Sequence, residues 1–261
     1  MKGLTVLKNI LWAFSILVCL GALVIGFGVS AFTKYSLPVE YEEQLEEVAQ
    51  EATGTLNKLG ETEDAGQSYI DSLTFLVDST LIGLRDYGLL TGGTSTTQVW
   101  GSQAGNISVE KMADPTVRLA DGSEKTASQA AAEVKPAVLV ISLGMDSLQK
   151  VDRTTFEANY AALVNNIRAA SPSTKIVLCS LSSVTSGYNS PDGITVEMAN
   201  TAQGWIQNVC RATGAYYADV THDVKDTSGT LLFDYAGVNN KALNTTGLNK
   251  VLEYLRMHAI G

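Results

Sequence analysis

A serine at the end of an apolar run is the residue of this chain best placed for nucleophilic chemistry. The run Leu73–Val77 stops at Asp78 and Ser79, and a helical pattern follows over Thr80–Leu90. A buried strand that leads into a helix through a tight polar turn presents a serine at the carboxyl edge of a parallel sheet. A serine in this position also commonly caps a helix without any catalytic role. The other strand ends must therefore decide what Ser79 does.

Strand-like and helix-like patterns alternate from residue 73 to the C-terminus. The strand-like runs are Leu73–Val77, Thr97–Trp100, Ala137–Leu143, Lys175–Leu181 and Ala215–Val220. The helical patterns are Thr80–Leu90, Ser128–Val134, Thr154–Ala170, Val196–Ala212 and Thr245–His258. This alternation predicts an α/β fold, a flavodoxin-like three-layer sandwich with a five-stranded parallel sheet covered on both faces. In such sheets the site lies at the carboxyl ends of the strands.

Several strand ends carry a block that resembles the SGNH/GDSL hydrolases. The blocks are Asp78-Ser79, the glycine loop Gly101–Asn106, the segment Val138–Asp146 and the closing segment Leu243–Leu255. The resemblance runs from about residue 69 to residue 260. It implies an SGNH-hydrolase-like fold and a serine ester hydrolase activity. In that family the serine attacks, its own N–H, a glycine N–H and an asparagine form the oxyanion hole, and an Asp-x-x-His pair supplies the acid and the base.

Carried over by position, the resemblance makes Ser79 the nucleophile, with Asp78 beside it in the cleft. The glycine of the oxyanion hole is either Gly101 or Gly105, and Asp146 stands at the position of the asparagine. A carboxylate there would repel the negative charge that develops in acyl transfer. One donor of the oxyanion hole is therefore altered.

The closing block also departs from the family pattern. Asn239 stands at the position of the acid and Ala242 at the position of the histidine. A serine hydroxyl needs a neighbouring base to attack a carbonyl, and alanine accepts no proton. The one alternative base is His222, which follows the fifth predicted strand, with Asp223 or Asp234 to orient it. His222 is otherwise an exposed loop histidine.

The N-terminal segment predicts a membrane anchor. Asn9–Thr33 contains no charged residue and is long enough to cross a bilayer core of about 30 Å. Lys2 and Lys8 precede it, which places the N-terminus in the cytoplasm and the remainder outside the cell. The alternative is a signal peptide cleaved near Ala31, which would release the protein.

An acidic helix over Pro38–Leu59 is expected next, because apolar residues recur at helical spacing and glutamates crowd its first turns. The predicted organisation is a tip and anchor over 1–36, an acidic helix and linker over 37–66, and the SGNH-like domain over 67–261. The net charge of −9 and the pI near 4.7 argue against nucleic acid as a partner. No motif indicates a metal or a cofactor, and Cys179 and Cys210 are either a disulfide or two buried thiols.

The sequence leaves three functions open. The first is a membrane-anchored pseudoenzyme of SGNH type, impaired as an esterase, that binds an acylated cell-envelope glycan. The second is an active esterase or O-deacetylase on such a polysaccharide, with Ser79 as nucleophile and His222 as base. The third is a scaffold protein that acts through its acidic helix. A serine-directed probe separates the first two.

Overall fold

The structure is a computed structural model that describes residues 54–261 of the chain. The predicted anchor Asn9–Thr33 and most of the predicted acidic helix lie outside the described residues. Within residues 54–261, none of the helices is both long and apolar enough to cross a membrane. The anchor therefore stays a prediction from the sequence.

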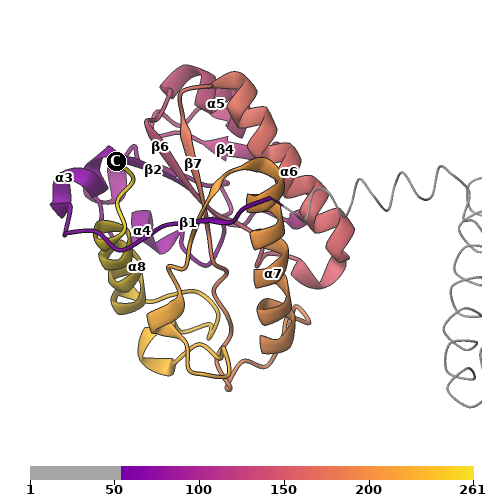
Figure 1. The fold of residues 1–261 in the computed structure, drawn as a ribbon. Helices are drawn as coiled ribbons and strands as arrows, with labels where there is room; N and C mark the ends of the chain where they lie inside the picture. Colours follow the sequence, from indigo (N-terminus) through magenta and orange to yellow (C-terminus); the bar gives the residue numbers. More distant parts are fainter. Residues whose placement is uncertain (1–53) are drawn as a thin grey trace, which may run out of the picture. The chain divides into compact units, whose positions relative to one another are not determined.

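A six-stranded parallel sheet forms the centre of the fold (Figure 1). In order across the sheet, the strands are β1 (Asn57–Lys58), β8 (Tyr216–Ala218), β7 (Lys175–Cys179), β6 (Val138–Ser142), β2 (Leu73–Val77) and β3 (Val99–Trp100). The central pair β2 and β6 aligns Leu73 with Val138 and Val77 with Ser142, so the two strands end side by side. The loops that follow β2 and β6 therefore begin next to each other.

Helices cover both faces of the sheet, as Figure 1 shows. The helices are α3 (Gly66–Ser72), α4 (Gly83–Asp86), α5 (Ala127–Val134), α6 (Arg153–Ala170), α7 (Val196–Thr213) and α8 (Thr245–Met257). Successive strand residues point to opposite faces. Leu139 and Ile141 of β6 accordingly pack with α5, α6 and α7, whereas Val138 and Val140 pack with α3, α4 and α8. The predicted α/β fold with three layers is confirmed.

The prediction of five strands is wrong, because Asn57–Lys58 adds β1 in parallel to β8. These residues had been assigned to the end of the acidic helix. Leu56 and Leu59 fit helical spacing, but Leu59 is buried in the core and its N–H donates to the carbonyl of Tyr217 at 2.9 Å. The pairing with β8 satisfies the hydrogen-bonding groups of this backbone segment, and it also buries the side chain of Leu59. Residues 57–66 therefore join the sheet to α3 within the same folded unit.

Two further features differ from the expectation. The helix predicted over Thr80–Leu90 is reduced to α4 with turns on both sides, and Gly88 adopts a positive φ of 65° just beyond it. An antiparallel hairpin of β4 (Thr116–Arg118) and β5 (Glu124–Thr126) lies between β3 and α5. Neither strand of the hairpin has an apolar run that the sequence could reveal.

The two cysteines of the described part are free thiols. Cys179 at the end of β7 and Cys210 in α7 are both buried, and no disulfide joins them. Burial raises the pKa of the Cys210 thiol to about 12, so it stays protonated and unreactive at neutral pH. Of the two alternatives left by the sequence, the structure has the buried thiols.

Candidate active site

Ser79 lies at the carboxyl edge of the sheet, in the turn directly after β2. The turn is fixed from two sides. The Asp78 N–H donates to the carbonyl of Ser142 at the end of β6 at 3.0 Å, and the Leu243 N–H donates to the carbonyl of Thr80 at 3.1 Å. Ser79 itself is partly exposed. The fold thus holds the predicted nucleophile where a ligand can reach it, next to the segment that precedes α8.

Asp78 is buried and serves the architecture of the turn. Its carboxylate accepts hydrogen bonds from the N–H groups of Gly144 and Met145, both at 3.0 Å, and from the N–H and hydroxyl of Thr80. Burial, with the nearby charge of Asp146, raises the pKa of Asp78 to about 6. This side chain joins the loop after β6 to the turn after β2 and does not face solvent.

The carboxylate of Asp146 contacts Ser79 directly. The Ser79 hydroxyl donates to Oδ1 of Asp146 at 2.5 Å, and the Ser79 N–H donates to Oδ2 at 3.2 Å. A third donor, the N–H of Ile107, reaches Oδ2 at 2.8 Å. Asp146 is buried, with 7 % of its surface exposed. The side chain of Asp146 therefore occupies the backbone donors beside the serine.

A buried lysine balances that charge. The Lys241 ammonium lies 3.5 Å from Oδ1 of Asp146 and 3.0 Å from Oδ2 of Asp192. Burial acts to raise the pKa of Asp192, but the hydrogen bonds from Tyr188 and Lys241 hold it below its ordinary value. A buried charge is costly without a partner, and this lysine is the cation that contacts the carboxylate of Asp146. The site is a chain of contacts from Ser79 through Asp146 and Lys241 to Asp192.

The residues at the family's acid and base positions form a turn. Oδ1 of Asn239 accepts hydrogen bonds from the N–H groups of Lys241 at 3.1 Å and Ala242 at 2.9 Å. Asn240 between them has a positive φ of 59°, which asparagine tolerates well. Asn244 then caps α8 by accepting from the N–H of Gly247. This segment therefore supplies the lysine to the site and no group that takes a proton from Ser79.

Comparison with known proteins identifies the family. The model of the GDSL-like lipase/acylhydrolase family matches residues 71–239, more than half of the chain. The protein belongs to the GDSL-like lipase/acylhydrolase family. The match begins just before β2 and ends at Asn239, before the segment that holds Lys241 and Ala242. No curated protein matches the chain.

Several solved structures are similar to this chain at low sequence identity. A proposed platelet activating factor from Streptococcus pneumonia has a TM-score of 0.50 and 14% identity, over 84% of this chain and 98% of its own. A GDSL-like lipase from Bacteroides thetaiotaomicron has a TM-score of 0.47 and 11% identity, over 82% and 94%. A carbohydrate esterase family 3 protein from Talaromyces cellulolyticus has a TM-score of 0.43 and 15% identity, over 70% and 93%.

The structure does not bring His222 to the GDSL serine. His222 and Asp223 lie exposed in a short 3-10 helix, η5 (His222–Val224), after β8. His222 lines a hollow with Gln203 and Gln207 of α7, and no hydrogen bond joins it to Ser79 within residues 54–261. As the structure stands, the hydroxyl of Ser79 is bonded to Asp146 instead.

The glycine loop contributes differently from the expectation. The carbonyl of Gly101 accepts from the N–H of Arg118 at 2.8 Å, and the N–H of Gly105 donates to Ser102 within its own turn. The donor that reaches Asp146 from this loop is the N–H of Ile107. Neither predicted glycine donates to the carboxylate.

Sequence reasoning missed Ile107, Lys241 and Asp192. A backbone donor such as Ile107 leaves no mark in the residue type. Lys241 lies within Asn239–Ala242, the four positions where the family has Asp-x-x-His. A charged residue at this place in the sequence could have indicated a role in the site. Asp192 lies in the loop after β7, and only the rule that sites follow strand ends points to it. Among residues 54–261, no group of three or more His, Cys, Asp and Glu side chains could hold a metal ion.

Proposed function

We propose that this protein is a membrane-anchored, extracytoplasmic pseudoenzyme of the GDSL-like family, which binds its ligand beside Ser79 without ordinary ester hydrolysis. One observation carries the proposal. The carboxylate of Asp146 already accepts the hydrogen bonds of the Ser79 N–H and of the Ile107 N–H. These are the backbone donors that would otherwise be free to stabilise an oxyanion beside the serine.

The electrostatics of this arrangement oppose acyl transfer. Removing a single oxyanion donor costs about 2.7–4 kcal/mol of transition-state stabilisation. Here the donors are not removed but are bonded to a buried carboxylate, which adds repulsion of the developing charge. Ala242 also leaves the serine without the family's base. Both features act in the same direction, because each raises the barrier to hydrolysis.

The ligand we propose is an acylated cell-envelope glycan. The support is the family, whose members act on esters, together with the anchor that the sequence predicts. A neutral, hydroxyl-rich sugar suits this site better than an anion, because Asp146 already occupies the backbone donors beside Ser79. Lys241 and Asp192 would be its further polar partners.

A fluorophosphonate probe tests the absence of turnover. The full-length wild-type chain in detergent should remain unlabelled under conditions that label an active serine esterase added as a positive control. The double variant Asp146→Asn with Ala242→His returns the asparagine donor and the histidine base, and it should gain labelling. Adding Ser79→Ala to that variant should abolish the gain. Wild-type labelling that disappears in Ser79→Ala would overturn the proposal.

The second candidate is an active esterase or O-deacetylase. The observation that favours it is the 2.5 Å hydrogen bond from the Ser79 hydroxyl to Asp146, which offers a proton acceptor in direct contact. If wild type is labelled, Asp146→Ala and His222→Ala distinguish the two possible bases. Loss of labelling only in His222→Ala would require η5 to move toward Ser79. The third candidate, a scaffold acting through residues 37–59, stays a prediction because most of that segment lies outside the described residues.

A further inference from the structure

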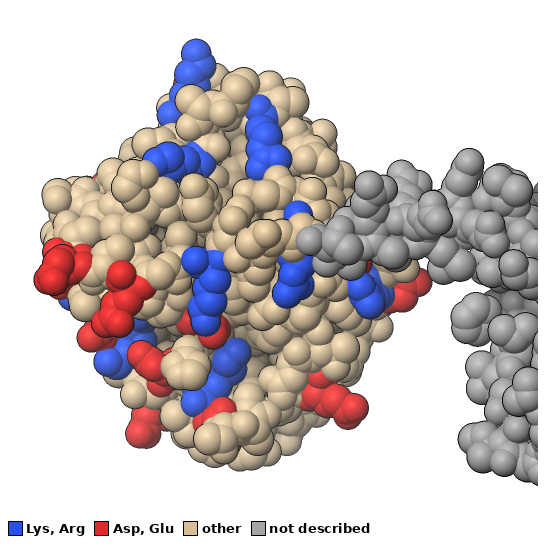
Figure 2. Space-filling view, viewed as in Figure 1, with Lys and Arg blue, Asp and Glu red and all other residues tan. Residues whose placement is uncertain are grey.

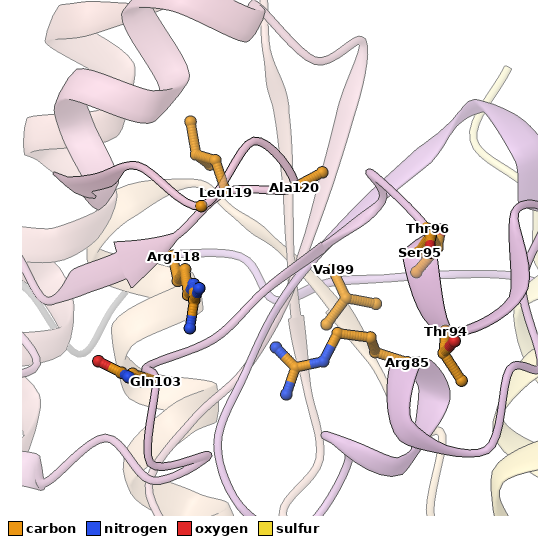
Figure 3. Close-up of a pocket in the computed structure, with 10 residues that line it drawn as sticks. Arg85, Thr94, Ser95, Thr96, Val99, Gln103, Arg118, Leu119 and Ala120 are labelled. Carbon is orange, nitrogen blue, oxygen red and sulfur yellow. The ribbon is translucent and has the colours of Figure 1, made fainter.

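A second hollow lies at the β3 edge of the sheet. It has a volume of about 320 Å³ and is formed by α4, the turn before β3, the glycine loop after β3 and the hairpin strand β4 (Figure 3). Its lining residues are Arg85, Thr94, Ser95, Thr96, Val99, Gln103, Arg118, Leu119, Ala120 and Gly122. Two of them are arginines and none is acidic. This volume is within the range of small-molecule sites.

The two arginines enter the hollow from different elements. Arg85 comes from α4 and Arg118 from β4, and Figure 3 shows both guanidinium groups reaching into the space between them. Arg85 donates to Asp86 through Nε at 2.9 Å, which leaves its two terminal nitrogens available. The Arg118 side chain makes no hydrogen bond or ion pair within residues 54–261. At least three guanidinium nitrogens are therefore free to bind the same group.

Neutral polar groups complete the wall of the hollow. Gln103 contributes an amide from the glycine loop, and Thr94 and Ser95 contribute hydroxyls that have no hydrogen-bond partner in the described part of the chain. Val99 and Leu119 add apolar surface. If the arginines bind the charged group of a ligand, an uncharged part of the same ligand, such as a sugar ring, could contact these neutral residues.

The charge of the hollow contrasts with the rest of the molecule. The chain has a net charge of −9, and on the face drawn in Figure 2 the basic side chains stand singly among acidic and uncharged ones. Asp86 offsets the charge of Arg85 in part, and no residue of the described part pairs with Arg118. An anion between the two like charges would reduce their repulsion. The planar fork of arginine matches the paired oxygens of phosphate and carboxylate groups.

We propose that the hollow between Arg85 and Arg118 binds an oxyanion, the phosphate or carboxylate group of a small or polymeric ligand. The inference is independent of the function proposed for Ser79, because within residues 54–261 no hydrogen bond or ion pair joins a residue of the hollow to Asp146 or Lys241, and neither of these lines the hollow. Each arginine should supply two parallel hydrogen bonds to the anion, and the hydroxyl and amide groups should bind the neutral part of the ligand.

Thermal unfolding of the full-length protein in detergent tests the site, because a ligand that binds only the folded state raises the unfolding midpoint. Potassium phosphate and potassium glucuronate are titrated separately, with potassium chloride keeping the ionic strength constant. The midpoint should rise saturably with one or both salts. A response to phosphate alone assigns a phosphate ester, a response to glucuronate alone assigns a carboxylate, and a response to both assigns a general oxyanion site.

Variants identify where the anion binds. Arg118→Gln should weaken the apparent affinity about tenfold, because the hydrogen bonds lost are to a charged group. Arg118→Lys keeps the charge but loses the fork and should fall between wild type and Arg118→Gln. The double variant Arg85→Gln with Arg118→Gln should show no saturable shift. Arg153→Gln is the matched control, because Arg153 is an exposed arginine of α6, and it should bind like wild type.

Two outcomes would overturn the inference. The first is the absence of a saturable shift in wild type with either salt. The second is an equal shift in wild type and in the double variant, which would place the anion elsewhere. Circular dichroism of each variant without added anion confirms that the fold is intact, and Arg118 is exposed, so its replacement should not disturb packing.

Discussion

The Ser79 site and the arginine hollow differ in how their charges are satisfied. At Ser79, the donors that could bind an anion are occupied by Asp146, and Lys241 neutralises that carboxylate from within the chain. In the hollow, Arg85 donates to Asp86 through Nε and keeps its two terminal nitrogens free, and no residue of the described part accepts from the Arg118 guanidinium. The first region contains its own counter-charge, whereas in the second Asp86 pairs with Arg85 alone and Arg118 is left without a partner in the described residues.

This difference separates stability from binding. A buried ion pair that loses one member leaves an uncompensated charge in a medium of low dielectric, so its residues are coupled to folding. An exposed arginine without a partner contributes little to folding and is available to a ligand. Substitutions in the two regions should therefore have effects of very different size on the free energy of unfolding.

Lys241→Ala should give the largest effect. It removes the cation that contacts both Asp146 and Asp192, and breaking a buried pair costs about 3–5 kcal/mol of unfolding free energy. Urea unfolding followed by fluorescence measures it. The matched control is Lys250→Ala, which breaks an exposed pair with Glu253 and should change the free energy of unfolding little. Equal effects of the two substitutions would contradict the distinction between the regions.

The double variant Lys241→Met with Asp146→Asn sharpens the same comparison. It removes the two most buried charges of the cluster and keeps similar side-chain volumes, while Asp192 remains with a side chain that is 30 % exposed. It should therefore recover part of the stability that Lys241→Ala loses. If the loss instead persists, packing of the lysine stem rather than its charge accounts for the first result.

The stability of the Ser79 region should depend on pH through Asp78. Its folded-state pKa, about 6, lies above the ordinary value of 3.8, so the folded state binds more protons between these values. The contribution of Asp78 to the free energy of unfolding is therefore fully present below about pH 4, and it is lost as the pH rises through about 6. In Asp78→Asn the free energy of unfolding should decline less between about pH 4 and pH 6, because asparagine does not titrate. Asparagine also lowers the stability at every pH, because its amide presents an N–H to the N–H donors of Gly144 and Met145. An unchanged slope in the variant would contradict this assignment.

Arg118→Gln should have the smallest effect on folding. Its guanidinium has no partner in the described residues, so the free energy of unfolding without added anion should change by less than about 0.5 kcal/mol. The same urea experiment measures it. A larger loss would mean that the Arg118 side chain stabilises the folded hairpin, in the way that we expect Lys241 to stabilise the Ser79 site.

The sequence alone determined the α/β layering and the position of the serine. Strand β2 ends at Val77 as expected, because a fully buried strand reads as a continuous apolar run that a polar turn must interrupt. Helices α6, α7 and α8 were also foreseen to within a residue or two at each end, since their apolar spacing is local. The two-residue strand β1 and the hairpin were not foreseen, because their pairing depends on distant partners and leaves no periodic pattern.

Only the tertiary structure decided what surrounds Ser79. The sequence showed that Asp146 and Ala242 depart from the family, but it could not show that Asp146 would turn its carboxylate onto the Ser79 and Ile107 donors. It also gave no reason to pair Lys241 with Asp146 and Asp192, which are separated from it by 49 residues or more. Residue types and local spacing set which groups are present at the edge of a sheet. The distances between their charges depend on how the loops pack, and those distances determine whether the serine has a base or a counter-charge beside it.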